Sequence, residues 1–139
     1  MSVKIFDRNM AMLEKAMELR SKKNSMIAAN IANRETPGYR AQDLVFEKAL
    51  DTALYSNKPG DLQVSDPRHF DGRQEIPIED VTGSQINSHN PDPRIDGNTV
   101  NLDKEMAKLA ENQLMYQAAA RSVNWKFRLL KSAIMEGGR

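Results

Sequence analysis

Residues 102–134 contain the pattern that decides the fold, and they read LDKEMAKLAENQLMYQAAARSVNWKFRLLKSAI. Alternating steps of four and three residues select ten positions there, of which all but Gln113 are apolar or aromatic. The ten are Leu102, Met106, Leu109, Gln113, Tyr116, Ala120, Val123, Phe127, Leu130 and Ile134. Such a seven-residue repeat predicts a helix that packs along one seam against another helix. At 1.5 Å per residue the helix is about 50 Å long, so it needs a long partner.

The N-terminal region supplies a helix of matching length. The same step gives Phe6, Met10, Leu13, Met17, Arg20, Asn24, Ile27 and Ile31, which predicts a helix over residues 7–32 with Asp7 in its first turn. We therefore expect the two terminal helices to pair as an antiparallel, coiled-coil-like hairpin. Arg20 and Asn24 interrupt the apolar seam, and they either fix its register or face a second subunit.

The chain between these helices has a different composition. Apolar spacing predicts a short amphipathic helix over residues 44–56, extended in its first residues, with Asp43 as its N-cap. Residues 57–97 contain Pro59, Pro67, Pro77, Pro91 and Pro93 and have too few apolar residues for a core of their own. Within them, residues 76–81 are compatible with a short edge strand.

These patterns predict a mainly α fold with a small irregular, β-containing insert in the middle. The expected units are residues 1–40 (the N-terminal helix and the turn after it), 41–56 (the short helix), 57–97 (the insert) and 98–139 (the C-terminal helix). Residues 1–56 and 98–139 should together form one discontinuous core domain.

Composition excludes several classes of protein. The 139 residues include no cysteine, so thiolate catalysis and disulfides are ruled out. No run of about eighteen apolar residues predicts a membrane span, and the first eight residues lack the features of a cleaved secretory signal. The net charge is +4 over residues 1–40, −6 over 41–100 and +3 over 101–139. This modest, dispersed basic surplus indicates solvated helix faces and does not indicate nucleic-acid binding.

Residues suited to chemistry are scattered. His69 and His89 lie in polar sequence with no third ligand at metal spacing, and no phosphate-binding loop or nucleophile motif is present. Tyr116 and Trp125 suit packing better than base stacking, because they are not interleaved with several other aromatic residues. We therefore expect no enzymatic activity, no cofactor and no metal.

Two motifs are more specific than this background. Asn30-Ile31-Ala32-Asn33 is followed by Thr36-Pro37-Gly38-Tyr39, and residues 96–106 read DGNTVNLDKEM. Together they resemble the terminal signatures of the bacterial flagellar axial proteins, the rod, hook and hook-associated family. The small size and the continuation over residues 39–46 are most similar to the short subunits of the proximal rod.

The resemblance implies a structural subunit that links the membrane (MS) ring to the rest of the rod and lines the export channel. The implied partners are other rod proteins, the rod-to-ring adaptor, the MS ring, the flagellar type III export apparatus and further copies in a helical tube. It also implies a periplasmic rod location, reached without a cleaved signal or membrane insertion. Two alternatives are a different short rod subunit and a coiled-coil adaptor or export chaperone for axial proteins.

The residues expected to contact other subunits lie on the two terminal helices and in the turn. On the N-terminal side they are Phe6, Met10, Leu13, Met17, Ile27, Ala28, Asn30, Ile31, Asn33, Thr36, Pro37, Gly38 and Tyr39. On the C-terminal side they are Leu102, Met106, Leu109, Tyr116, Val123, Trp125, Phe127, Leu130 and Ile134.

Overall fold

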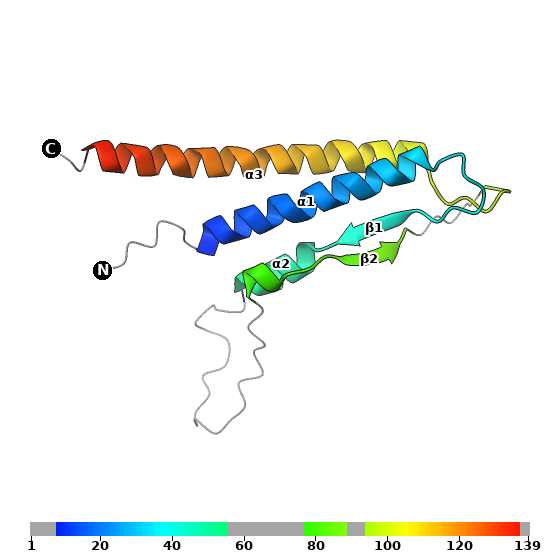
Figure 1. The fold of residues 1–139 in the computed structure, drawn as a ribbon, viewed down its shortest axis with the longest axis horizontal. Helices are drawn as coiled ribbons and strands as arrows, with labels where there is room; N and C mark the ends of the chain where they lie inside the picture. The colour runs from blue at the N-terminus through cyan, green and yellow to red at the C-terminus, as the bar shows by residue number, and fades with distance from the viewer. Residues whose placement is uncertain (1–7, 56–76, 89–93, 137–139) are drawn as a thin grey trace, which may run out of the picture.

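A computed structural model describes residues 8–55, 77–88 and 94–136 of the chain. Its elements are helix α1 (Arg8–Ala32), strand β1 (Gln42–Val45), helix α2 (Glu47–Tyr55), 3-10 helix η1 (Ile78–Asp80), strand β2 (Ser84–Asn87) and helix α3 (Leu102–Glu136). The two long helices run antiparallel, side by side (Figure 1), which confirms the mainly α fold. Phe6, Asp7, His69 and His89 lie outside the described residues.

Helix α1 is the central layer of the molecule. Figure 1 shows α3 along one side of α1 and the layer of β1, β2 and α2 along the other. The two strands are antiparallel, with Gln42 opposite Asn87 and Val45 opposite Ser84. Every described element therefore packs on α1 or on a neighbour of α1.

The short helix predicted over residues 44–56, with its first residues extended, is confirmed as strand β1 followed by helix α2. Residues 42–45 form β1, and the helix begins at Glu47, so Asp43 is a strand residue and the predicted N-cap is wrong. Burial alternates from Leu44, which is buried, to Val45, which is exposed, as it does in a half-buried strand. The Glu47 carboxylate accepts the Phe46 N–H at 3.2 Å and satisfies a backbone group near the start of α2.

The predicted edge strand over residues 76–81 is also wrong. Residues 78–80 form the 3-10 helix η1, which follows Pro77, and the strand lies further on at Ser84–Asn87. All four residues of β2 are exposed. No buried alternation was therefore available in the sequence to mark this strand.

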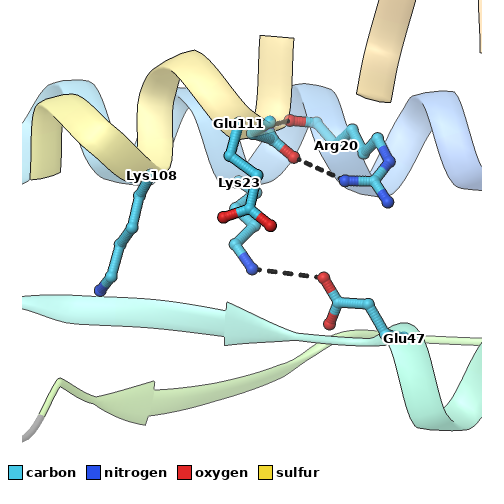
Figure 2. Close-up of a pocket in the computed structure, with 6 residues that line it drawn as sticks. Arg20, Lys23, Glu47, Lys108 and Glu111 are labelled. Carbon is cyan, nitrogen blue, oxygen red and sulfur yellow. Dashed lines mark hydrogen bonds and ion pairs between the residues drawn. The ribbon is translucent and has the colours of Figure 1, made fainter. Parts of the chain in front are cut away.

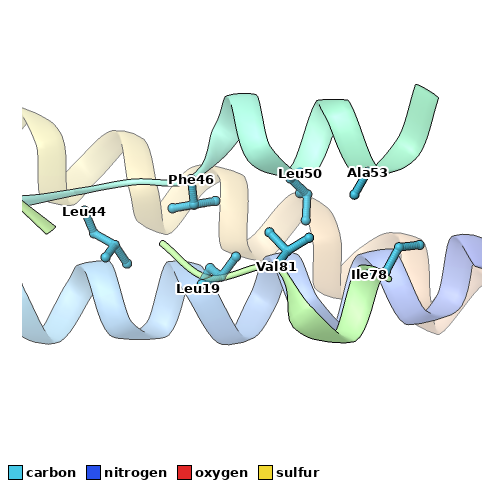
Figure 3. Packing of buried hydrophobic residues seen from close by; sticks show 7 residues of the cluster. All are labelled: Leu19, Leu44, Phe46, Leu50, Ala53, Ile78 and Val81. Carbon is cyan, nitrogen blue, oxygen red and sulfur yellow. The ribbon is translucent and has the colours of Figure 1, made fainter. Parts of the chain in front are cut away.

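The main apolar core lies between α1 and α2. Figure 3 shows its buried members, which come from α1, β1, α2, η1 and the residues that adjoin them: Leu19, Leu44, Phe46, Leu50, Ala53, Ile78 and Val81. Two of these residues, Ile78 and Val81, belong to the segment that was expected to be a polar insert. Gly83 adjoins this core, because a Cβ there would lie 2.6 Å from Leu44 Cδ1.

The seam between α1 and α3 differs from the predicted apolar one. Glu105, Asn112 and Ala119 are the buried residues of α3, spaced seven apart. Of the ten predicted seam positions on α3, Leu109, Tyr116, Ala120, Val123 and Leu130 are half-buried, whereas Leu102, Met106, Gln113, Phe127 and Ile134 are exposed. The predicted stripe is therefore rotated partly away from α1. On α1 itself the predicted seam fits better, since Met10 and Ile27 are buried and Leu13, Met17 and Ile31 are half-buried.

The position of the core leads to a stability prediction. Phe46→Ala should lower the free energy of unfolding by about 3–5 kcal/mol, because it leaves a cavity where a ring is 1% exposed. Val45→Ala is the matched control on the neighbouring residue, which is 41% exposed, and should cost less than about 1 kcal/mol. Urea denaturation followed by circular dichroism measures both, and equal effects would contradict this description of the core.

Candidate assembly interface

The two motifs that resemble the flagellar axial proteins lie about 60 residues apart in the sequence, and in the fold they are joined by hydrogen bonds. The Gly38 N–H donates to Asp96 O at 2.9 Å, and the Thr99 N–H donates to Tyr39 O at 3.0 Å. The Ala41 N–H donates to the Thr99 hydroxyl oxygen at 2.9 Å. The segment before α3 is thus fixed against the turn that follows α1.

Asn98 closes this contact from inside. Its side chain is completely buried, and its Nδ2 lies 3.0, 3.1 and 2.8 Å from the carbonyl oxygens of residues 33, 34 and 36. Its Oδ1 accepts the Val100 N–H at 2.8 Å. The carbonyls at the end of a helix have no intrahelical partner, and here the two N–H groups of one amide lie within hydrogen-bond distance of three carbonyls just after α1, so one N–H is shared between two of them.

The turn itself is of type II. The Tyr39 N–H donates to Thr36 O at 3.3 Å, and Gly38 has φ +70°, which follows from its place as the third residue of such a turn. The Asn33 amide donates to Ala29 O at 2.8 Å and caps the end of α1. We therefore name residues 30–41 and 94–105 together the clasp.

Asn30 joins the clasp to both β1 and α3. Its side chain is 0% exposed, and its Nδ2 donates to Gln42 O at 2.7 Å and to the Glu105 carboxylate at 2.8 Å. Its Oδ1 accepts the Gln42 N–H at 3.0 Å and the Tyr39 hydroxyl at 3.3 Å. All four hydrogen bonds that a buried amide side chain can make are therefore formed within the subunit.

The start of α3 is fixed by a cap and by charge. The Asn101 side chain accepts the Lys104 N–H at 3.1 Å and so caps the N-terminus of α3. Lys108 Nζ lies 2.8 Å from the Asp43 carboxylate and 3.3 Å from that of Glu105, so α3 is tied to β1 by charge. Lys23 of α1 approaches Asp43 at 3.7 Å.

These charges act on one another through a partly buried space. Burial disfavours the charged form of Asp43, but its hydrogen bond to Lys108 and the charges of Lys108 and Lys23 outweigh that effect and lower the pKa of Asp43. Burial likewise opposes the charge on Lys108, yet its hydrogen bond to Asp43 and the charge of Glu105 raise the pKa of Lys108. The ion pair therefore remains charged at neutral pH.

A second polar group lies seven residues, or about two helical turns, beyond Glu105 along the seam. Asn112 is buried, accepts a hydrogen bond from the Arg20 guanidinium at 3.1 Å and donates to the Asn24 side chain at 2.9 Å. Arg20 and Asn24 were expected either to fix the register of the seam or to face a second subunit. In the structure both side chains form hydrogen bonds with Asn112 in the seam within the subunit. Arg20 is also 5.5 Å from the centre of the Phe46 ring, in cation–π geometry.

Figure 2 shows the small cleft beside this group, about 50 Å³ in volume and between α1, α2 and α3. The residues that line it are Arg20, Lys23, Glu47, Lys108, Glu111 and Asn112. Most of its charges are engaged in ion pairs or hydrogen bonds, such as Lys23 with Glu47 at 3.3 Å. In the part of the chain that the structure describes, no group of three His, Cys, Asp or Glu side chains could hold a metal ion.

The outward surface of α3 is unusually apolar. Most of the large hydrophobic side chains that are exposed in the described residues lie on this helix: Leu102, Met106, Leu114, Met115, Trp125, Phe127, Leu129, Ile134 and Met135. They occur around most of the helix circumference rather than on one stripe. This number of large apolar side chains exposed on one helix indicates that α3 contacts other proteins.

The structure places the predicted contact residues in three environments. Met10, Ile27 and Asn30 are buried within the subunit; Leu13, Met17, Ile31, Asn33, Tyr39, Leu109, Tyr116, Val123 and Leu130 are half-buried; and Ala28, Thr36, Pro37, Gly38, Leu102, Met106, Trp125, Phe127 and Ile134 are exposed. Sequence reasoning did not single out Asn98, Glu105 or Asn112 as clasp and seam residues. In the sequence, the only feature that marks these residues is a polar side chain beside or within an apolar repeat.

The chain is similar in sequence to known proteins over most of its length. Residues 10–40 match the family model described as flagella basal body rod protein. The chain is 34% identical over 135 residues to flagellar basal body rod protein FlgB of Bacillus subtilis, covering 97% of this chain and 98% of that protein. The chain belongs to the FlgB family of flagellar basal body rod proteins. It is also 30% identical over 127 residues to FlgB of Escherichia coli (89% of this chain, 91% of that protein) and 29% identical over 113 residues to FlgB of Borreliella burgdorferi (80% and 84%).

Because the chain belongs to the FlgB family, the clasp and the exposed face of α3 are features of a flagellar basal body rod protein. A basal body rod is built from protein subunits, and the chain is a structural component of it that associates with other rod components. Among the described residues, no helix is both long enough and apolar enough to cross a membrane.

Asn98 provides a test of the clasp. Asn98→Asp should lower the free energy of unfolding by at least about 2 kcal/mol at pH 7, because a buried carboxylate would face carbonyl oxygens at 2.8–3.1 Å. Asn87→Asp, on the exposed strand β2, makes the same chemical change and should have little effect. Chemical denaturation compares the two, and a stable Asn98→Asp protein would refute the role of this amide.

The ion pair between Asp43 and Lys108 predicts a pH dependence. Because the pKa of Asp43 is lowered on folding, its contribution is fully present above the unfolded value of about 3.9 and is lost as the pH falls through the lowered value. Asp43→Asn should therefore reduce stability by roughly 1 kcal/mol at pH 7, and the difference from the unmodified protein should shrink below about pH 4. Urea denaturation from pH 7 to pH 2.5 measures this difference. Asp51→Asn, at an exposed carboxylate on α2, is the control, and a constant Asp43→Asn effect across the range would exclude the ion pair as its source.

Proposed function

We propose that this chain is a subunit of the proximal rod, which links the MS ring to the rest of the rod with its terminal helices lining the export channel. Its partners would be other copies of itself, other rod proteins, the rod-to-ring adaptor and the MS ring. It would reach the periplasmic rod through the flagellar type III export apparatus without a cleaved signal, and it would act without cofactor or catalysis.

The observation that carries this proposal is the exposed apolar surface of α3 in a chain of the FlgB family. Polar groups hold α3 to α1 at Glu105 and Asn112, so few of its large apolar side chains are used within the subunit. Burying them against neighbours would contribute about 25 cal/mol per Å² of apolar surface. A subunit that gains most of its apolar burial on association is suited to a cooperative assembly.

The predicted repeat on α3 indicates which flank neighbours would use. Leu102, Met106, Phe127 and Ile134 are exposed, whereas the other apolar members of the repeat are half-buried. A helix of a neighbouring subunit along that flank would complete a three-helix seam with α1 and α3. The buried Asn30 would act indirectly, by holding the start of α3 in place.

Two alternatives remain distinct from this proposal. A FlgC-like short rod subunit would occupy the same structure at a different level of the rod. A coiled-coil adaptor or export chaperone for axial proteins would bind them away from the rod, and a stable homodimer that is absent from purified basal bodies would favour it.

The decisive experiment is an in-frame deletion of the gene, followed by electron microscopy of purified basal bodies. We expect membrane rings without rods, and cells that do not swim. Complete basal bodies in the deletion strain would reject the proposal. Rods that begin normally but stop at a later level would favour the FlgC-like alternative.

Surface variants can then separate assembly from folding. Phe127→Ser combined with Ile134→Ser should leave the thermal unfolding of the purified protein nearly unchanged, because both side chains are exposed, but should abolish complementation of swimming. Ile86→Ser, at an exposed apolar residue on β2, is the control and should complement. Normal swimming with the double variant would argue against this flank as a subunit contact.

A further inference from the structure

A second surface of α3 is directed away from the rest of the subunit. Steps of four and three residues from Leu114 select Leu114, Ala118, Arg121, Trp125, Arg128 and Ser132, and all six are exposed. Leu114 and Arg121 lie two residues after the buried Asn112 and Ala119, which corresponds to about 200° around the helix. The other four residues continue the same stripe along α3. We name these six residues the outer stripe.

The outer stripe is both apolar and basic. Leu114 and Trp125 are 64% and 62% exposed, although both are large apolar side chains. Between residues 113 and 135 the charged residues are Arg121, Lys126, Arg128 and Lys131, so no acidic side chain lies in this part of the helix. In the described part of the chain, Arg121 and Arg128 form no ion pair with a carboxylate.

The opposite side of the molecule carries the complementary charge. Asp51 of α2 and Glu79 and Asp80 of η1 are exposed and form no ion pair within the described residues, and Lys48 is the basic side chain on α2. The helices α2 and η1 pack on α1, and Figure 1 shows α2 on the opposite side of α1 from α3. The sequence of residues 56–76, which connect α2 to η1, holds three basic and four acidic residues.

We propose that the outer stripe of one copy binds the acidic surface of α2 and η1 on the next copy. Arginine and tryptophan are enriched at the centres of protein interfaces, where they combine charge with large contact area. Opposite charges on the two surfaces steer the copies into one relative orientation and disfavour stripe-to-stripe pairing.

The arrangement has a consequence for symmetry. Since the two surfaces differ and lie on opposite sides of α1, the contact is heterologous, and each added copy leaves one surface of each kind open. Side-by-side addition of copies around or along a tube follows from such a contact. The inference deepens the proposed rod function by naming two surfaces that meet, and it does not depend on which level of the rod the subunit occupies.

Charge reversal with mutual rescue tests this pairing. The first variant carries Arg121→Glu and Arg128→Glu, and the second carries Glu79→Lys and Asp80→Lys. Lys104→Glu is the matched control, at an exposed residue on the first turn of α3. Circular dichroism establishes that each variant retains its helices, and sedimentation velocity at about 50 mM and 500 mM salt measures association.

The unmodified protein and the Lys104→Glu control should associate, and less so at high salt, since surface charges are screened there. Each reversed variant alone should associate at least tenfold more weakly. An equimolar mixture of the two variants should recover association, because every reversed stripe then meets a reversed acidic surface. Absence of association by the unmodified protein, normal association by the single variants or a mixture that fails to recover would each overturn the pairing.

Cysteine pairing provides an independent readout, because the chain contains no cysteine of its own. A mixture of Trp125→Cys and Asp51→Cys proteins should form a mixed disulfide more readily than either protein forms a homodimer, and equal yields would contradict the proposal. The two proposals can fail separately. Intact basal bodies in the deletion strain together with mutual rescue would reject the rod function alone, whereas missing rods without rescue would reject this pairing alone.

Discussion

The fold depends on the requirement that a buried amide must have all of its hydrogen-bonding groups satisfied. Asn30 meets this requirement with groups from the turn, β1 and α3, so its burial is possible only when all three are in place. Asn98 imposes the same condition on the end of α1, since its amide serves carbonyls of residues 33, 34 and 36. No buried side-chain polar atom among the described residues lacks a partner. These two asparagines give the clasp one geometry, because a partly formed set of bonds would leave costly unpaired groups.

The two sides of α1 have different roles that follow from their chemistry. One side presents Leu19 to the apolar core with α2 and η1, and burial there supplies non-directional stabilisation. The other side presents Arg20, Asn24 and Asn30 to α3, where hydrogen bonds fix register but contribute only about 1 kcal/mol each. Helix α3 is therefore placed accurately and held by directional contacts, while much of its apolar surface remains outside. This separation explains how one subunit can have a defined shape and still offer a large hydrophobic surface to others.

Sequence patterns predicted the parts of the fold that depend on long-range periodicity. The two long helices followed from spacing, and Pro37-Gly38 and Asn101 are the residue types that a type II turn and a helix N-cap favour. The seam residues on α3 could not be predicted in this way. An apolar repeat indicates which side chains avoid water, but it does not indicate whether their partner lies within the subunit or in another subunit. Asn112, next to the predicted Gln113, is the residue that α1 engages, because Arg20 and Asn24 form hydrogen bonds with it. Strand β2 was not predictable, since its four residues are exposed and carry no pattern of burial. The predicted domain boundaries and subunit contacts remain predictions.

The clasp also has a consequence for the order in which the chain acquires its shape. Its hydrogen bonds between the two segments connect residues 58 to 75 positions apart, and those of the Asn112 group connect residues 88 and 92 apart. Most helical proteins fold quickly because their contacts are local, whereas contacts at this separation require a large loop to close first. The N-terminal helix and turn cannot obtain these partners until the start of α3 is available. The apolar core of α1, β1, α2 and η1 contains no residue of α3, so that part of the fold can form first, whereas the clasp closes only once the last third of the chain is present.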